Sequence, residues 1–106
     1  MSGAAEAGVP AVSVVIPHLN QPEHLRRCLA ALDAQVGAPA FEVIVVDNGS
    51  RALPEGVCAA HGAALLAEAE AGAAPARNGG GAAARAPLLA FIDADCIADP
   101  GWLAAL

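Results

Sequence analysis

The chain has 106 residues, enough for one domain with a single core, and 29 of them are alanine, so the core depends on a few runs of larger apolar residues. Five Arg, no Lys and 11 acidic residues give a formal net charge of -6 at pH 7. This charge excludes polyanionic partners such as nucleic acids and anionic membrane surfaces, whereas a small anionic ligand can still bind through a metal ion.

The first predicted elements are a lead, a strand and a helix. Residues 1–11 have neither a basic nor an apolar region, so we expect a disordered lead and no secretory signal. Residues 12–16 (VSVVI) predict a strand that Pro17 ends. Asn20 and Glu23 have the spacing of a capping box and predict the start of an amphipathic helix. Its apolar residues recur at helical spacing: Leu25, Cys28, Leu29, Leu32 and Val36.

A second strand and a short βα unit follow. Residues 41–46 (FEVIVV) predict a strand buried on both faces, closed by the turn Asp47-Asn48-Gly49-Ser50. Residues 54–61 predict a short helix that Gly62 ends, and residues 63–67 predict a third strand.

The last third of the chain is less regular. Residues 68–76 predict a loop, and residues 77–85 a helix that three glycines weaken by roughly 1 kcal/mol each relative to alanine. Residues 88–92 (LLAFI) predict the fourth strand. Asp99-Pro100 predicts the start of a last helix, within which the sequence stops and where Trp102 is expected to pack in the core.

Strands that alternate with helices predict an α/β fold, with a mostly parallel sheet of about four strands and flanking helices. We expect no membrane segment in this chain, since no apolar run approaches the roughly 20 residues of a membrane span. The three cysteines lack metal-binding spacing and predict reduced, mostly buried thiols, so we expect a cytoplasmic protein.

The best candidates for chemistry follow the predicted strands, because ligands of such sheets bind at the carboxyl ends of the strands. Asp93 and Asp95 come directly after an apolar strand and lie two residues apart, so both can point to one side. Two close carboxylates repel each other unless a cation intervenes, and Mg²⁺ or Mn²⁺ bound with substrate phosphates would neutralise them. The alternative is an ordinary acidic turn.

Three further candidates each have a plainer alternative. Asp47 can accept a hydrogen bond from a nucleobase imide or simply close a turn. Arg77 and Asn78, before three glycines, predict a helix N-terminus that approaches an anion, or a flexible segment. His18 lies in the predicted site loop, where it could contact a ligand. No G-x-G-x-x-G follows a strand and no Walker motif occurs, which argues against those nucleotide sites.

Three motifs in this order resemble the N-terminal, donor-binding half of a family 2 glycosyltransferase of the GT-A fold, which is Rossmann-like. The motifs are VSVVIPHLNQPEHLRRCLAAL, FEVIVVDNGS and ARNGGGAAARAPLLAFIDADCIADPGWL. The resemblance covers residues 12–106 and implies a partial nucleotide-sugar-binding domain. It implies a nucleoside-diphosphate sugar donor, usually UDP-linked, a divalent metal, and inverting transfer to an acceptor hydroxyl of unknown identity.

The resemblance also implies roles for individual residues. Pro17 and the loop from His18 to Asn20 match the segment along the nucleoside, and Asp47 matches the aspartate that recognises the base. Arg77 matches an arginine near the nucleotide. The D-x-D signature is matched by Asp93, in the ribose and metal region, and by Asp95, which ligates the Mn²⁺ or Mg²⁺ that bridges the diphosphate.

Two departures limit the resemblance. Leu19 stands where an aromatic residue is common, and the acidic general base of inverting members is expected downstream, beyond Leu106. We therefore expect a donor-binding portion that does not turn over efficiently alone. The alternatives are a non-catalytic nucleotide-binding or interaction module of the same fold, and a nucleotidyltransferase-like relative, which lacks support because no basic phosphate-binding signature follows the first strand.

Overall fold

A computed structural model describes residues 9–106 of the chain. Most of the predicted disordered lead, residues 1–8, lies outside the described residues. The end of the predicted lead is ordered, because the amide of Ala11 donates a hydrogen bond to the carbonyl of Ala40 at 2.8 Å. The helices and strands are β1 (Val12–His18), α2 (Pro22–Asp33), β2 (Phe41–Asp47), α3 (Glu55–Ala60), β3 (Ala64–Ala67), α4 (Ala73–Ala83) and β4 (Leu88–Phe91).

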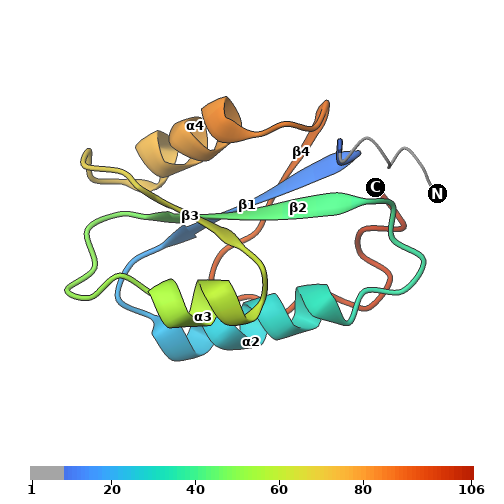
Figure 1. Cartoon of the computed structure of the whole chain (residues 1–106), viewed down its shortest axis with the longest axis horizontal. Helices are drawn as coiled ribbons and strands as arrows, with labels where there is room; N and C mark the ends of the chain where they lie inside the picture. The colour runs from blue at the N-terminus through green and yellow to red at the C-terminus, as the bar shows by residue number, and fades with distance from the viewer. Residues whose placement is uncertain (1–8) are drawn as a thin grey trace.

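Within the described part of the chain, the four strands form one sheet in the order β3-β2-β1-β4, and every pair is parallel. The chain moves outward from β1 to β3 and then returns to the other side of β1. Right-handed crossovers therefore place α2 and α3 on one face of the sheet and α4 on the other, as Figure 1 shows. The predicted α/β fold with a parallel sheet is confirmed.

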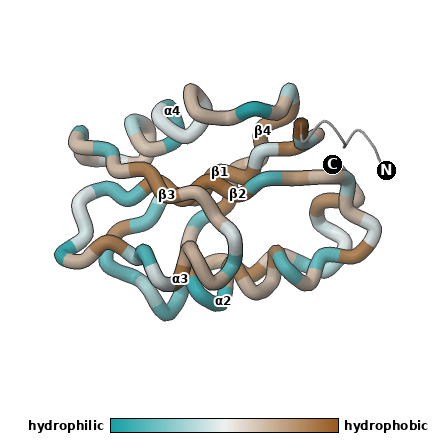
Figure 2. Tube along the Cα trace, in the orientation of Figure 1, coloured by the Kyte–Doolittle hydropathy of each residue, from teal (hydrophilic) through white to brown (hydrophobic). Residues whose placement is uncertain are grey.

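Alternate residues of β1 supply the cores on the two faces. Val14 and Ile16 are buried with the apolar stripe of α2, whereas Val15 is buried with residues of β2 and α4. Figure 2 shows the resulting brown, hydrophobic centre of the sheet between more polar helix surfaces. Burial on both faces explains why the first two strands are continuous apolar runs.

Helix α4 begins four residues before the predicted start at residue 77, and it ends at Ala83. The predicted helix N-terminus at Arg77 and Asn78 is therefore wrong, because both residues lie inside α4. Packing offsets the poor helix propensity of the glycines. A Cβ atom added at Gly80 would lie 2.3 Å from Val15 Cγ1, so only glycine lets α4 approach the sheet this closely.

Strand β1 continues through Pro17 to His18, so the prediction that Pro17 ends the strand is wrong. The missing amide of proline costs little here. The carbonyl of Val15 points toward β4 and accepts a hydrogen bond from the amide of Ile92. Backbone groups two residues apart in a strand point to the same side, so the backbone nitrogen of Pro17 also faces the β4 side. Strand β4 pairs with β1 only as far as Val15, so no ladder hydrogen bond is lost at Pro17.

The predicted capping box of α2 is also absent. The N-cap residue is Gln21, without a side-chain capping bond, and Asn20 has a left-handed φ of 53°. The helix ends at Asp33, before Val36, which is exposed. The predicted last helix is a series of turns over residues 100–105, in which Trp102 packs against the core on the α2 side.

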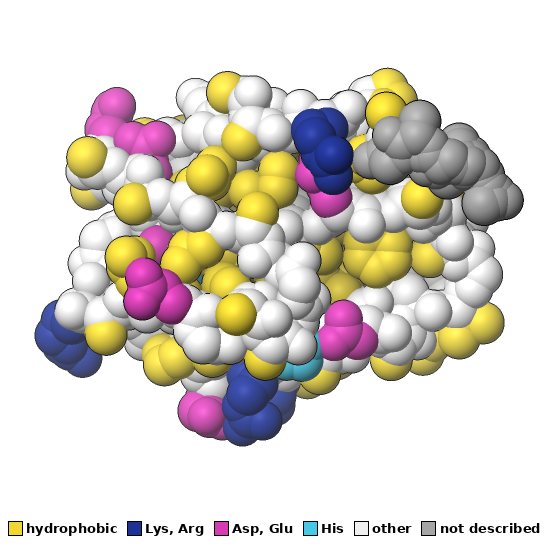
Figure 3. Space-filling model, viewed as in Figure 1, with side chains coloured by type: hydrophobic (Ala, Val, Ile, Leu, Met, Phe, Trp, Pro, Cys, Tyr) yellow, Lys and Arg dark blue, Asp and Glu magenta, His cyan; other side chains and the backbone are white. Residues whose placement is uncertain are grey.

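Strand β4 lies at one edge of the sheet, and its apolar side chains Leu88, Leu89 and Phe91 are exposed. At the opposite edge, β3 is only partly covered, and Figure 3 shows hydrophobic side chains in yellow between the two helix layers. No helix among residues 9–106 has the length and apolar character needed to cross a membrane.

Candidate functional site

A cavity of about 400 Å³ opens at the carboxyl ends of β2, β1 and β4, and the strand order reverses between β1 and β4. Its walls come from the β1–α2 loop, the end of β2, the start of α4 and the loop after β4. We call it the first cavity. It is lined by Pro17, His18, Leu19, Gln21, Asn48, Ala71, Gly72, Ala73, Asp93, Ala94 and Asp95. This is where ligands of open parallel sheets bind.

His18 and Asp47 form a buried pair beneath this cavity. They are opposite each other in the parallel register of β1 and β2, and only 3% and 1% of their surfaces are exposed. His18 Nε2 accepts a hydrogen bond from the amide of Gln21 at 3.0 Å, so in the neutral ring the proton lies on Nδ1. That proton is donated to Asp47 Oδ1 at 2.8 Å.

The Asp47 carboxylate also accepts hydrogen bonds from the hydroxyl of Ser50 at 2.6 Å and from the amides of Gly49 and Ser50. Burial by itself raises the pKa of Asp47. The hydrogen bonds from Ser50 and His18 lower the pKa by more than burial raises it, so the net shift is downward. These contacts use the accepting capacity of both oxygens. The contact of Asp47 with a nucleobase stays a prediction, and a base would have to compete with these hydrogen bonds.

The same network joins the two loops at the rim. The amide of Asn20 donates to Ser50 Oγ at 2.8 Å, and Asn20 Oδ1 accepts from the amide of Arg51 at 2.9 Å. Asparagine tolerates the left-handed backbone that this geometry requires. Asn20 thus holds the β1–α2 loop against the loop after β2, and the structure does not place it in the lining of the first cavity.

Asn48, the residue after Asp47, lies on the wall of the first cavity. Its side-chain amide donates to the carbonyls of Glu68 and Glu70, and its oxygen accepts from the amide of Gly72 at 2.7 Å. These bonds fasten the loop before α4 to the end of β2. The sequence analysis did not select Asn48 and Ser50 as site residues, although both lie in the turn that directly follows a buried strand.

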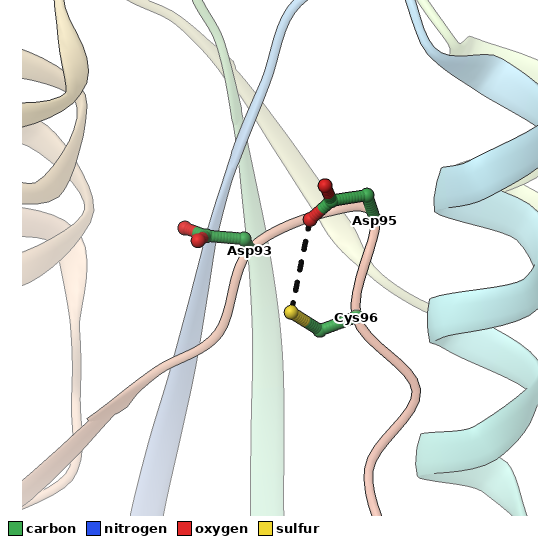
Figure 4. A group of neighbouring side chains, drawn as sticks. All are labelled: Asp93, Asp95 and Cys96. Carbon is green, nitrogen blue, oxygen red and sulfur yellow. Dashed lines mark hydrogen bonds between the residues drawn. The ribbon is translucent and has the colours of Figure 1, made fainter.

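Asp93 and Asp95 lie at the other end of the first cavity, in the loop after β4. With Cys96 they form a group in which one ligand atom from each residue lies within 4.8 Å of the others. Figure 4 shows the Asp93 carboxylate pointing toward α4, while the Asp95 carboxylate lies beside the Cys96 thiol, with 3.7 Å between Oδ1 and Sγ. The two carboxylates therefore lie close together.

The donor set fits a hard divalent cation. Two exposed carboxylates supply oxygen ligands, and the open side leaves room for substrate phosphates and water, which is how proteins commonly bind Mg²⁺. A single thiol without a histidine beside it among the described residues is a poor start for a zinc site. The predicted metal ligands are thus brought together at the rim of the cavity.

Cys28 of α2 lies underneath this loop. It is fully buried, and its thiol donates a weak hydrogen bond to the carbonyl of Asp93 at 3.8 Å. Burial raises the pKa of Cys28 to about 11, and the nearby carboxylates of Asp95 and Asp93 act in the same direction. Cys28 is therefore a neutral thiol that supports the loop from below, in agreement with the predicted buried thiols.

Arg77 is not part of the lining of the first cavity. It projects from the second turn of α4, and its guanidinium lies 3.9 Å from Asp93 Oδ1, farther than a hydrogen bond. It lines a second cavity of about 410 Å³ on the β4 side. Of the predicted nucleotide residues, Pro17, His18 and Asp93 line the first cavity, whereas Asn20, Asp47 and Arg77 do not.

Comparison with known proteins identifies the family. The chain is 34% identical over 102 residues to the glycosyltransferase AglE of Haloferax volcanii, covering 90% of this chain and 34% of that relative. Glucosyl-3-phosphoglycerate synthase of Mycobacterium tuberculosis, solved with Mn²⁺, UDP and glucosyl-3-phosphoglycerate, superposes with a TM-score of 0.68 at 28% identity, covering 86% of this chain and 35% of that one.

A mannosyltransferase of Pyrobaculum calidifontis, solved with GDP-Man and Mn²⁺, superposes with a TM-score of 0.71 at 25% identity, covering 81% of this chain and 28% of that one. The chain thus spans about a third of the length of the relatives that it matches. These neighbours confirm the predicted GT-A type of Rossmann-like fold. The model of the family described as glycosyl transferase family 2 matches residues 13–106, and the chain belongs to this family.

Proposed function

We propose that the first cavity binds the nucleoside diphosphate of an activated sugar, UDP-linked, together with Mn²⁺ or Mg²⁺. The observation that carries the proposal is the pair of carboxylates, Asp93 and Asp95, at the rim of a cavity at the reversal of strand order. A solved neighbour that binds UDP and Mn²⁺ supports it. In family members, such a site serves transfer of the sugar to an acceptor hydroxyl, here proposed with inversion.

The cavity has two chemically different ends. The end at Asp95 and Asp93 would hold the metal and, through it, the diphosphate, and the bound metal would stabilise the negative charge of the leaving group. The end at Leu19, Asn48 and Gly72 would hold the nucleoside. Asp47 and Asn20 would contribute from behind, because they fasten the loops that form this wall.

The residues of the cavity do not include a free general base. Both acidic side chains of its lining, Asp93 and Asp95, are assigned to the metal, so neither is available to deprotonate an acceptor hydroxyl. We therefore propose donor binding as the function of these 106 residues, and we assign the general base to a part of the enzyme outside the first cavity.

Isothermal titration calorimetry with UDP, with and without Mn²⁺, tests the proposal. We expect Mn²⁺ to tighten UDP binding at least about tenfold in the wild-type chain, because the diphosphate otherwise meets two carboxylates. Asp95→Ala should remove this metal dependence. Asp99→Ala removes the same charge from a residue outside the cavity lining and should retain it.

Two results would contradict the proposal. UDP binding of equal strength with and without Mn²⁺, unchanged in Asp95→Ala, would exclude the metal site and favour a non-catalytic nucleotide-binding module. GDP binding tighter than UDP binding would contradict the assignment of the base, an outcome that the neighbour solved with GDP-Man makes worth measuring.

A further inference from the structure

The segment between β3 and α4, residues 68–72, forms part of the wall of the first cavity (Figure 1). We call it the strap. Its last two residues, Ala71 and Gly72, line the cavity together with Ala73, the first residue of α4. These residues carry at most a methyl group, so no side chain can change its rotamer to close a gap. The fit of this wall to a ligand therefore depends on where the backbone of the strap lies.

The strap has little core packing to hold it in place. Residues 69–74 are all exposed, and the first buried residue of α4 is Ala76. Glu68 continues the pairing of β3 with β2, because its amide donates to the carbonyl of Asp47 at 2.8 Å. Beyond Glu68 the backbone leaves the sheet, and Gly72 has a φ of 117°, which L side chains rarely adopt. Hydrogen bonds, rather than buried side chains, must offset the entropy lost in ordering this path.

Asn48, the residue directly after β2, supplies these hydrogen bonds. Its side-chain nitrogen donates to the carbonyl of Glu70 at 2.7 Å and to that of Glu68 at 3.2 Å, and its oxygen accepts from the amide of Gly72 at 2.7 Å. Both N–H donors of the side chain are thus used by the strap. An aspartate here would have the same shape, but it could only accept, and its charge would face two carbonyl oxygens.

We propose that Asn48 is a positioning residue of the donor site, which holds the strap where the first cavity fits the nucleoside. It acts through the strap rather than by donating to the ligand, because both of its N–H donors are engaged. This inference rests on the proposed function, which assigns the nucleoside to this end of the cavity and the diphosphate to the metal. Asn48 therefore contributes to binding of the nucleoside, and not to binding of the diphosphate.

Isothermal titration calorimetry with two ligands separates these contributions. UDP and pyrophosphate are each titrated with Mn²⁺ into the full 106-residue chain, and the ratio of their affinities measures what the nucleoside adds. We expect the wild-type chain to bind UDP tighter than pyrophosphate. Asn48→Ala should weaken UDP binding about tenfold, because a loosened wall must be ordered when the nucleoside binds, and should change pyrophosphate binding by less than about twofold.

Asn48→Asp tests whether donation by the amide is what matters. It keeps the shape of the side chain and loses both donations, so the affinity ratio should fall as in Asn48→Ala. The new charge repels both anionic ligands, and the ratio largely cancels this repulsion. Asp95→Ala provides the opposite pattern, since loss of a metal ligand should weaken UDP and pyrophosphate together.

Gln35→Glu is the matched control, because Gln35 makes the same kind of contacts away from the first cavity. Its amide group donates to the carbonyls of Ala31 and Asp99 and accepts from the amide of Leu103. Like Asn48 it is partly buried, but it is not part of the cavity lining. Gln35→Glu removes two donations and adds a charge, and it should leave the affinity ratio at the wild-type value. Circular dichroism checks that each variant folds.

An unchanged ratio in Asn48→Ala, or an equal fall in Gln35→Glu, would overturn the positioning role. Equal weakening of UDP and pyrophosphate by Asn48→Ala would also overturn it, because a general loss of structure affects both ends of the cavity. Failure of the proposed function is read separately, in the wild-type chain. If Mn²⁺ does not tighten UDP binding there, the donor site itself is wrong, and this inference falls with it.

Discussion

Two acidic regions at the same edge of the sheet are built in opposite ways. At the ends of β1 and β2, Asp47 is buried and accepts hydrogen bonds from His18, Ser50 and two backbone amides. In the loop after β4, Asp93 and Asp95 are exposed, and the ion pair of Asp93 with Arg77 is long.

The difference distinguishes a carboxylate that stabilises the loops from carboxylates that are exposed to a ligand. A carboxylate whose oxygens already accept hydrogen bonds from the protein maintains the shape of the loops. Carboxylates without close partners add little to stability, and their oxygens remain open to the cation that we propose. The contrast predicts that substitutions in the first region lower stability, whereas those in the second lower binding.

The largest effect is expected for Asp47→Ala. It leaves the Nδ1 proton of His18, the hydroxyl of Ser50 and two amides without their acceptor, and buried donors without partners should cost about 2–4 kcal/mol of unfolding free energy in total. Urea unfolding followed by circular dichroism measures this.

Asp93→Ala is the matched control, because it removes the same carboxyl from the exposed region. We expect its unfolding free energy to stay within about 0.5 kcal/mol of the wild type. The contrast between the regions fails if the two substitutions destabilise the chain equally.

Gly80→Ala tests whether close packing of α4 holds the wall of both cavities. The new methyl group would lie 2.3 Å from Val15 Cγ1 and 3.1 Å from Val46 Cγ2, so α4 must shift, at an expected cost of about 1–3 kcal/mol. The same urea titration applies. Gly56→Ala, in α3 with no heavy atom within 4 Å, should instead stabilise the chain by about 0.5 kcal/mol. Equal effects at both positions would exclude a packing role for Gly80.

The pH dependence of stability distinguishes the two regions without a change in packing. The net downward shift of the pKa of Asp47 means that its contribution to stability is complete above the ordinary aspartate pKa and is lost as the pH falls through the folded value. Asp47→Asn should therefore flatten the decline of unfolding free energy on acidification from pH 5 to the acid limit of folding.

A residual slope should remain in Asp47→Asn. Burial raises the pKa of Glu42, but the hydrogen bonds from Ser13 and Arg85 lower the pKa by a larger amount, so the net shift is downward. The stability that Glu42 contributes is therefore also lost as the pH falls. Asp95→Asn is the control from the exposed loop and should keep the wild-type slope. An equally flat profile for both variants would contradict the special role of Asp47.

The smallest intervention is labelling of the thiols with a disulfide reagent at pH 8. Cys96 is exposed and should react first, whereas Cys28 and Cys58 are buried and should react only after unfolding. Burial also raises the pKa of Cys28 to about 11, which keeps the thiolate scarce at this pH. Mn²⁺ with UDP should slow the labelling of Cys96, and rapid labelling of all three thiols in the native chain would show that the loop region opens.

The sheet could be predicted from the sequence because its signals are local. The apolar runs at residues 12–16 and 41–46 predict strands buried on both faces, and the alternation of strands and helices predicts a parallel sheet. The closeness of Asp93 and Asp95 could be predicted because the two residues follow an apolar strand directly, with one residue between them. Each of these signals lies within a few neighbouring residues.

The remaining features depend on contacts between distant segments. Helix propensity argues against glycines in α4, and only the closeness of Val15 shows why Gly80 stands there. The role of Asp47 depends on His18, which is 29 residues away, because the register of two strands decides whether a carboxylate is filled by the protein or open to a ligand. The side of β4 on which Arg77 lies likewise follows from the packing of α4.

The exposed edge at β4 has a consequence for handling the protein. Leu88, Leu89 and Phe91 lie on an outer strand whose backbone can pair with another strand. At pH 7 the net charge of -6 keeps copies of the chain apart, but the isoelectric point is near 4.7. Mild acidification therefore removes colloidal repulsion while the strand edge stays exposed, and turbidity should rise as the pH approaches 4.7.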